Sequence, residues 1–285
     1  MVGVCIGKGI YPFKKLRHAG TGEPADEVRG SYLQHIYEDP LFNREAGRNN
    51  GVVNCSIFKT GAGGIHLRGG DRKTLQPGNN YVENTVIHDF NRIEKSYRAG
   101  IDISGVGNRI SHCEIYNAPS MAILMRGNDH LFEYNEIHHV CQEVHDRGAL
   151  YYGRDPSERV HIVRYNFFHH LNSVHATSAV YHDDGACGME VDGNVFYKPG
   201  KIPVLIGGGH DNPYTSNIFI DADLGIHVDN RNQRWAKKII EKGGIYEKRL
   251  NIVNHDEPPY SKRYPSLANS WEDNPSLPKR NPVSK

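Results

Sequence analysis

The chain has 285 residues, with 34 basic and 33 acidic side chains, and this length is sufficient for a full hydrophobic core. The near balance of charge leaves no long-range attraction for a phosphate backbone or an anionic membrane, so we expect neither nucleic acid nor a membrane as a partner. No apolar run of about 18 residues occurs, and the N-terminal stretch MVGVCIGKGIYPFKK has its lysines on the wrong side for a secretory signal. As written, the chain is expected to be unexported and cytoplasmic.

The composition also limits the class of fold. Five scattered cysteines without a CxxC pair fit neither a disulfide framework nor a zinc site, so reduced cysteines in the core are predicted. Thirty glycines, with little alanine, argue against a helical bundle and indicate many turns.

Residues 1–48 carry no clear copy of any repeat and are predicted to form an irregular N-terminal capping segment. After them, a strand-like unit recurs with spacings that vary from coil to coil, as expected for a solenoid whose turns carry loops of different length. Its copies are GIHLRG from Gly64, GIDISG from Gly100, AILMRG from Ala122, ALYYGR from Ala149, AVYHDD from Ala179, VLIGGG from Val204 and GIHVDN from Gly225.

A second unit follows the first in constant order. Asparagine often heads this unit, which suits a stacked ladder because asparagine tolerates left-handed backbone geometry and its amide can bond to the coils above and below. The copies are CSIFK from Cys55, TVIHD from Thr85, CEIYN from Cys113, NEIHH from Asn135, NFFHH from Asn166, NVFYK from Asn194 and NIFID from Asn217.

The two units together predict an all-β chain that folds as one right-handed parallel β-helix of about seven coils, over residues 49–233. No helical period of similar strength separates the strands, which disfavours an alternating strand-and-helix fold. Residues 234–285 are predicted to form a short helix, from RWAKKIIEKGG, and a tail rich in proline and asparagine. A solenoid end needs a cap, and the oligomeric state is left open.

Side chains alternate along a strand, so the apolar second position of the first unit faces inward, with Leu205 as its copy in VLIGGG. The third and fifth positions then form an exposed polar ribbon. Tyr151 and Tyr181 lie on neighbouring coils of this ribbon and are predicted to stack as sugar-binding platforms. The other substrate-binding candidates are Arg126, Arg147, Arg154, Asp155, His182 and His210.

His182 occupies a fourth position, which the register turns inward beside Asp183. The alternative to substrate binding is a buried imidazole bonded to a backbone carbonyl. Paired histidines also follow the second unit on consecutive coils, at 138–139 and 169–170. No carboxylate or cysteine joins them at a repeated spacing, so stacking of solvent-facing rings is expected there, and neither a metal nor a cofactor is predicted.

Carboxylates gather in two neighbouring coils, in EVHDRGALYYGRDP and AVYHDDGACG. From about Asn50 to Asn230 the sequence resembles the right-handed β-helix proteins of carbohydrate-active enzymes, in particular the glycoside hydrolases with fucosidase and xylanase activities. The resemblance rests on GGIHLRGGDRKTLQPGNN, HDRGALYYGRD, YHDDGACGMEVDGNVFY and VLIGGGHDN. It implies an oligosaccharide or polysaccharide substrate that is hydrolysed by two carboxylates, Asp146 with Asp183 or Asp184.

The register raises a geometric objection to this pair. A straight strand would separate Asp146 from Asp183 by roughly 20 Å, whereas glycosidase carboxylates lie roughly 5 to 9.5 Å apart. The pair is expected to work only if the chain turns at Arg147–Gly148. Otherwise Asp155 with Asp184 is the expected pair, and in either case Arg147 or Arg154 would hold one carboxylate ionised.

Two other functions remain open from the sequence. A polysaccharide lyase would use Tyr151, Tyr181 or His182 as a base, with Arg126 or Arg154 neutralising a uronate, because no lysine occurs between Ser96 and Tyr197. A non-catalytic glycan-binding β-helix, or a fragment of a longer protein, would only adhere through its polar ribbon.

Overall fold

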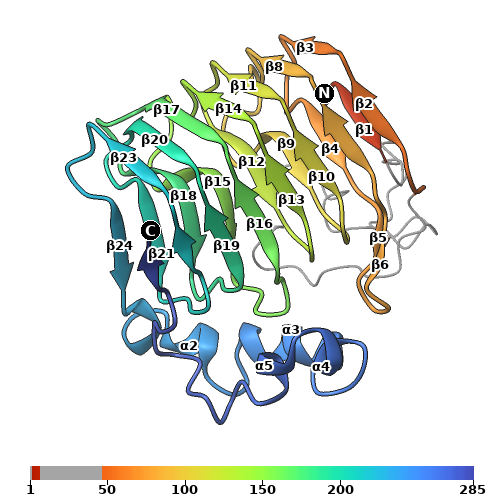
Figure 1. The fold of residues 1–285 in the computed structure, drawn as a ribbon, viewed down its shortest axis with the longest axis vertical. Helices are drawn as coiled ribbons and strands as arrows, with labels where there is room; N and C mark the ends of the chain where they lie inside the picture. The colour runs from red at the N-terminus through yellow and green to blue at the C-terminus, as the bar shows by residue number, and fades with distance from the viewer. Residues whose placement is uncertain (1, 7–46) are drawn as a thin grey trace.

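The computed structural model describes residues 2–6 and 47–285, and most of the predicted capping segment lies outside these residues. The described chain winds into stacked coils whose strands form three parallel sheets, as Figure 1 shows. This confirms the predicted all-β parallel β-helix. Sheet A consists, in order, of β1 (Val4–Ile6), β4 (Ile65–Leu67), β9 (Ala99–Ile103), β12 (Met121–Met125), β15 (Arg147–Gly153), β18 (Thr177–Asp183), β21 (Val204–Gly207) and β24 (Ile226–Asp229).

The two repeated units of the sequence form the strands of sheets A and C. The second unit forms sheet C, which consists of β3 (Ser56–Phe58), β8 (Val86–His88), β11 (Glu114–Tyr116), β14 (Glu136–His138), β17 (Phe167–Leu171), β20 (Val195–Pro199) and β23 (Ile218–Ile220). The strand β1 shows that the N-terminal segment is not wholly irregular, because it pairs with β4 at the edge of sheet A.

The third sheet was not predicted. Its strands are two to four residues long and usually bury one or two side chains, so they leave little periodicity in the sequence. Sheet B consists of β2 (Gly51–Val53), β7 (Tyr81–Glu83), β10 (Arg109–Ser111), β13 (Leu131–Glu133), β16 (His161–Arg164), β19 (Met189–Asp192), β22 (Tyr214–Thr215) and β25 (Val283–Ser284). The short strands β5 (Gly70–Asp71) and β6 (Gln76–Pro77) form a separate antiparallel pair.

One predicted register was wrong by a residue. Val204, not Leu205, pairs with Val180, so Val204 points inward and Leu205 lies beside Tyr181 on the outer face of sheet A. The sequence allowed either register because three consecutive apolar residues begin VLIGGG, and the neighbouring strand decides between them.

Aliphatic columns fill the interior of the helix. The inward residues of sheet A lie in register across the coils, as in the pairs Ile65–Ile101 and Leu150–Val180, and these four side chains are fully buried. Sheet C contributes stacked rings, with Phe168 and Phe196 at 5.2 Å between centroids. Because each side chain packs on its equivalent in the next coil, one continuous core serves the whole solenoid.

The predicted asparagine ladder runs along the inside of the turn before sheet C. The Oδ1 of Asn166 accepts a hydrogen bond of 2.9 Å from the backbone N–H of Asn135, and Asn194 does the same for Asn166. The left-handed residue is the one before each ladder position, such as Tyr134 and Tyr165, each with φ of 56°. This differs from the expectation that asparagine itself adopts the left-handed conformation.

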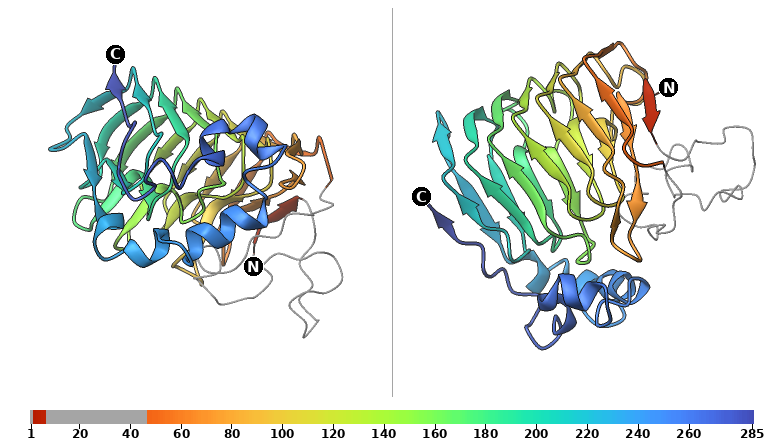
Figure 2. Two further views of the ribbon diagram at one scale, coloured as in Figure 1. Left: turned by 90° about the horizontal axis from the view of Figure 1, so that it is seen from below. Right: turned by 45° about the vertical axis from the view of Figure 1, so that its right-hand side comes forward.

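The C-terminal segment folds against the side of the β-helix, as both views of Figure 2 show. It has a small core of its own, which includes Tyr246, Leu250 and Tyr260. The single short helix predicted here is in fact a series of helices, and the tail ends in β25, which pairs with β22. The helices are the 3-10 helix η2 (Arg231–Gln233) and the α-helices α2 (Lys237–Ile240), α3 (Ile245–Ile252), α4 (Tyr260–Arg263) and α5 (Pro265–Ala268).

The five cysteines form no disulfide bond; Cys113, Cys141 and Cys187 are buried, whereas Cys5 and Cys55 are exposed and so do not belong to the core. Within residues 2–6 and 47–285, none of the helices has the length and apolar character needed to cross a bilayer.

Candidate active site

The outer face of sheet A is largely buried between β9 and β21, which corrects the prediction of an exposed ribbon. Tyr151 and Tyr181 are only 2% and 3% exposed. Their rings meet edge to face, at 87° and 5.3 Å between centroids, so they do not form stacked sugar platforms. They belong to an apolar patch that also contains Leu124 and Leu205, against which Tyr97 packs.

The hydroxyl groups of these two tyrosines point at carboxylates. Tyr151 donates a hydrogen bond of 2.5 Å to Oδ2 of Asp183, and Tyr181 donates one of 2.8 Å to Oδ1 of Asp146. Burial raises the pKa of both phenols, and the charge of Asp183 raises it further. Both phenols are therefore held as neutral donors.

Two arginines hold the adjacent aspartates at the end of β18. Nη1 of Arg231 lies 2.9 Å from Oδ1 of Asp183 and 3.2 Å from Oδ1 of Asp184, and Nε of Arg154 lies 2.5 Å from Oδ2 of Asp184. Asp184 is fully buried, has a left-handed φ of 39° and is followed by Gly185, with φ of 84°. Asp184 is therefore an internal counter-charge that no substrate can reach.

Asp183 has the surroundings of a carboxylic acid that keeps its proton. Burial raises its pKa, and the neighbouring charge of Asp184 raises it further, to about 7, although Tyr151 and Arg231 lower it. A small part of its surface stays accessible, at 8% of the residue. At neutral pH this group is therefore divided between a proton donor and a carboxylate.

Asp146 lies on the other side of Tyr181 and is exposed. It has a left-handed φ of 56° just before β15, and this turn brings its carboxylate over the outer face of sheet A, within reach of Tyr181. Beside it, the guanidinium of Arg147 stacks on the ring of Tyr97 at 3.6 Å. The turn needed to bring Asp146 back over the sheet thus occurs at Asp146 itself, one residue before the predicted position.

The contacts of Tyr181 set an upper limit to the separation of the two carboxylates. Its hydroxyl lies 2.8 Å from Asp146 Oδ1 and 3.3 Å from Arg231 Nη1, which is 2.9 Å from Asp183 Oδ1. These three contacts connect Asp146 Oδ1 to Asp183 Oδ1. The two oxygens therefore lie no farther apart than the upper end of the range of roughly 5 to 9.5 Å that glycosidases use. The separation of roughly 20 Å expected for a straight strand does not apply, because the chain turns at Asp146.

Arg231 was not recognised from the sequence. It comes from η2, 47 and 48 residues after the aspartates that it binds, and its guanidinium also bonds to Asp229. The only sequence signal is its position just after the last coil. Such a position carries no periodicity, and folding of the C-terminal segment alone brings it to the site.

The two members of the alternative pair, Asp155 and Asp184, contact different arginines in the structure. Asp155 accepts hydrogen bonds from Ser157 and pairs with Arg72 at 3.4 Å, in a cluster with Glu158. Asp184 instead pairs with Arg154 and Arg231.

Three other predicted substrate-binding residues lie elsewhere. His182 is fully buried inside the coil, and its imidazole bonds to Tyr152 and Tyr214 at 2.9 and 2.6 Å, not to a backbone carbonyl. His210 is buried and bonds to Asp211 at 2.8 Å. Arg126 pairs with Asp102 at 2.8 Å, on earlier coils of the same face. Burial lowers the pKa of His182 to about 3, so this ring is a neutral core group.

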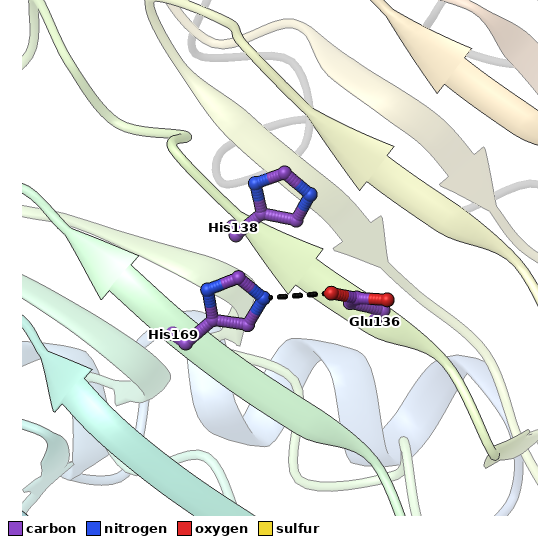
Figure 3. Close-up of side chains that lie close together, drawn as sticks. All are labelled: Glu136, His138 and His169. Atoms are coloured by element: carbon purple, nitrogen blue, oxygen red, sulfur yellow. Dashed lines mark hydrogen bonds and ion pairs between the residues drawn. The ribbon is translucent and has the colours of Figure 1, made fainter.

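The paired histidines form the expected column of stacked rings on the outer face of sheet C. The rings of His138 and His169 lie 4.5 Å apart at 10°. Contrary to expectation, carboxylates join them, because Glu136 Oε1 lies 2.9 Å from His169 Nε2 (Figure 3). Glu114 Oε1 lies 3.1 Å from His138 Nε2 in the same way. Glutamate two residues before a strand histidine lies on the same face, a spacing visible in the sequence.

Fold and sequence comparison agree on the class of protein, a right-handed parallel β-helix. The family model described as right handed beta helix region matches residues 45–220, and the chain belongs to this family. No curated protein matches the chain. A solved structure named "Glycoside hydrolase" is similar with a TM-score of 0.44 and 16% identity, over 71% of this chain and 36% of that one. The match thus spans about a third of the length of that protein.

Proposed function

We propose that the chain hydrolyses glycosidic bonds of a complex oligosaccharide or polysaccharide, with Asp183 as the general acid and Asp146 as the base or nucleophile. The observation that carries this proposal is the contrast between the two carboxyl groups. Asp183 is buried with a pKa raised to about 7, whereas Asp146 is exposed, and both bond to the same short chain of contacts through Tyr181 and Arg231. Carboxyl groups whose surroundings differ in this way are suited to acid and base roles.

In the proposed reaction, protonated Asp183 donates its proton to the glycosidic oxygen as the bond to the anomeric carbon breaks. Asp146 either removes a proton from the attacking water or attacks the anomeric carbon itself, and water then releases the sugar. Asp184 acts as a positioning residue, because its charge raises the pKa of Asp183. Tyr181 would orient Asp146 through its hydrogen bond.

The contacts favour hydrolysis over the lyase alternative. A lyase base must lose its proton near neutral pH, and burial raises the pKa of Tyr151 and Tyr181. The arginines expected to neutralise a uronate are already paired, Arg126 with Asp102 and Arg154 with Asp184. A uronate would have to compete with these carboxylates.

The test is a screen of the purified chain against fucosylated, xylan-type and uronate-containing polysaccharides, with reducing ends and ultraviolet absorbance read together. We expect reducing ends without absorbance. Asp183→Asn and Asp146→Asn should each lower kcat by at least about a hundredfold and leave substrate binding largely unchanged. The activity of the parent chain should fall above about pH 7 as Asp183 loses its proton.

The matched control is Asp221→Asn, an exposed aspartate after β23 in a left-handed position that asparagine tolerates. It should retain full activity. Ultraviolet absorbance would assign the chain to the lyases instead, and glycan binding without any product, unchanged in both aspartate variants, would identify a non-catalytic binding module.

A further inference from the structure

We propose that Glu136, His138 and His169 form a binding site for a divalent transition metal ion, of which Zn²⁺ is the representative, on the outer face of sheet C. One ligand atom from each of the three side chains lies within 4.8 Å of the other two. Figure 3 shows the three side chains together on β14 and β17. The site lies on a different sheet from Asp146 and Asp183 and does not depend on the proposed hydrolysis.

The backbone register brings the three groups together. Strands β14 and β17 are parallel, with His138 directly opposite His169 and Glu136 opposite Phe167. Glu136 and His138 are two residues apart and so point to the same side of the sheet. The carboxylate already bonds to His169 on the next coil, at 2.9 Å from Nε2.

Two imidazoles and a carboxylate form a donor set that suits zinc, with bonds of roughly 2.0 to 2.2 Å. Ligand atoms around a tetrahedral ion of this size lie roughly 3.4 Å apart. The Glu136 and His169 atoms, at 2.9 Å, must therefore separate slightly, and atoms as far apart as 4.8 Å must approach by somewhat more than an ångström. Rotation of the side chains can provide this movement, because Glu136 is 49% exposed and the imidazoles keep 14% and 11% of their side-chain surface. Water can occupy the remaining position on this open face.

The second nitrogen of each imidazole has a partner that would support a metal-bound ring. Nδ1 of His138 lies 2.7 Å from Nδ1 of His139, and the same distance separates His169 from His170. In each pair one nitrogen must donate and the other accept. With a metal on Nε2, the Nδ1–H of the ligating ring donates to its neighbour, which is the outer-shell contact that fixes ring orientation in metal sites.

Stacking alone does not require histidine in this column. The equivalent positions on earlier coils are Phe58 and Tyr116, whose rings stack with those of His88 at 5.2 and 4.9 Å. A phenyl ring therefore fits the column, which supplies a variant that retains packing and removes the ligand. Histidine on two adjacent coils, with glutamate beside it, adds metal-binding groups that stacking does not use.

The test is calorimetric titration of the untagged chain with Zn²⁺, together with the visible spectrum on addition of Co²⁺. We expect one ion whose affinity falls at least tenfold in His138→Phe, His169→Phe and Glu136→Gln. The control is His112→Asn, which removes an exposed, stacked histidine of the turn before sheet C and keeps a residue that tolerates its left-handed φ of 52°. Its affinity should equal that of the parent.

Thermal unfolding without metal serves as the check on folding, and the phenylalanine variants should melt with the parent. Should a variant fail to fold, selective paramagnetic shifts of the ring protons of His138 and His169 by Co²⁺ in the parent chain decide the question. An absence of binding to the parent, affinities unchanged in all three variants, or paramagnetic shifts confined to other histidines would overturn the proposal.

Discussion

Asp183 shows how one side chain acquires a property that its sequence neighbours do not reveal. It follows His182 on the strand, but its pKa depends on burial, on Asp184 and on hydrogen bonds from Tyr151 and Arg231, two residues from other coils. An aspartate in a polar turn would look the same in the sequence. The difference arises because the local solvent and partners, not the residue type, determine whether a carboxyl group keeps its proton.

Asp183 also gives a pH dependence of stability with a definite sign. Its pKa is about 7 in the folded chain and about 4 when unfolded, so the folded state binds more protons between these values. The free energy of unfolding therefore falls as the pH rises through this window. Asp183→Asn cannot ionise and should be more stable than the parent at pH 8, by on the order of 2 kcal/mol, with little gain at pH 4.

Urea unfolding of the parent and the variant at pH 4 and pH 8 measures this difference. The exposed Asp221→Asn serves as the comparison and should differ from the parent equally at both pH values. A variant that is less stable than the parent at pH 8 would show that folding does not raise the pKa of Asp183.

At the scale of elements, the asparagine ladder connects the coils at the turn before sheet C. The side chain of Asn166 is buried and donates to the carbonyls of Phe132 and Arg164, while its Oδ1 accepts from Asn135. A serine or alanine here would leave several backbone groups without partners inside the molecule.

Asn166→Ala should therefore lower the free energy of unfolding by about 2 to 4 kcal/mol. The measurement is urea unfolding at neutral pH, followed by circular dichroism. Asn251→Ala in α3, where the asparagine is exposed, is expected to change stability by less than about 0.5 kcal/mol. Equal effects of the two substitutions would mean that the ladder contributes no more than a surface residue.

At the scale of the whole molecule, the C-terminal segment and the β-helix depend on each other. Arg231 from η2 completes the carboxylate cluster, and the hydroxyl of Tyr260 in α4 lies 3.4 Å from Asn128, which also accepts from Arg72. Arg72 pairs in turn with Asp155 and Glu158. A charged cluster is therefore buried where the helices cover the coils. Because unfolding would expose this cluster to water, the pKa values of its members depend on whether the chain is folded.

Glu158 within this cluster predicts a second pH effect. Burial, with the charge of Asp155, raises its pKa to about 8, so between about pH 6.5 and 8 the folded chain keeps a proton that the unfolded chain has released. Stability should fall across this window by about 1 to 2 kcal/mol. Buried histidines such as His182 act in the opposite direction only below about pH 6.5, where unfolding protonates them.

Glu158→Gln keeps an oxygen to accept the backbone N–H of Gly127 and should flatten the fall in melting temperature between pH 6.5 and 8. Scanning calorimetry at closely spaced pH values measures the slope. The exposed Glu241→Gln should leave the slope unchanged, and an identical slope for Glu158→Gln would place the ionisation in another group.

The sequence by itself determined the β-helix, sheets A and C and the asparagine ladder, because each coil repeats the same short-range pattern and stacks on its neighbour. It also identified Asp146, Asp183 and Asp184 as candidates, since carboxylates gather in adjacent coils. Only the tertiary structure decided the third sheet and the register of Val204, where short or uniformly apolar strands carry no distinctive period.

The tertiary structure alone also decided what surrounds the candidate residues. It pairs Asp155 with Arg72 and His210 with Asp211, buries Tyr151 and Tyr181, and brings Arg231 to Asp183 from the C-terminal segment. The physical reason is that repeat patterns reflect contacts between equivalent positions of adjacent coils. The burial, charge and partners of a site arise from segments that have no repeat and lie far apart in the chain.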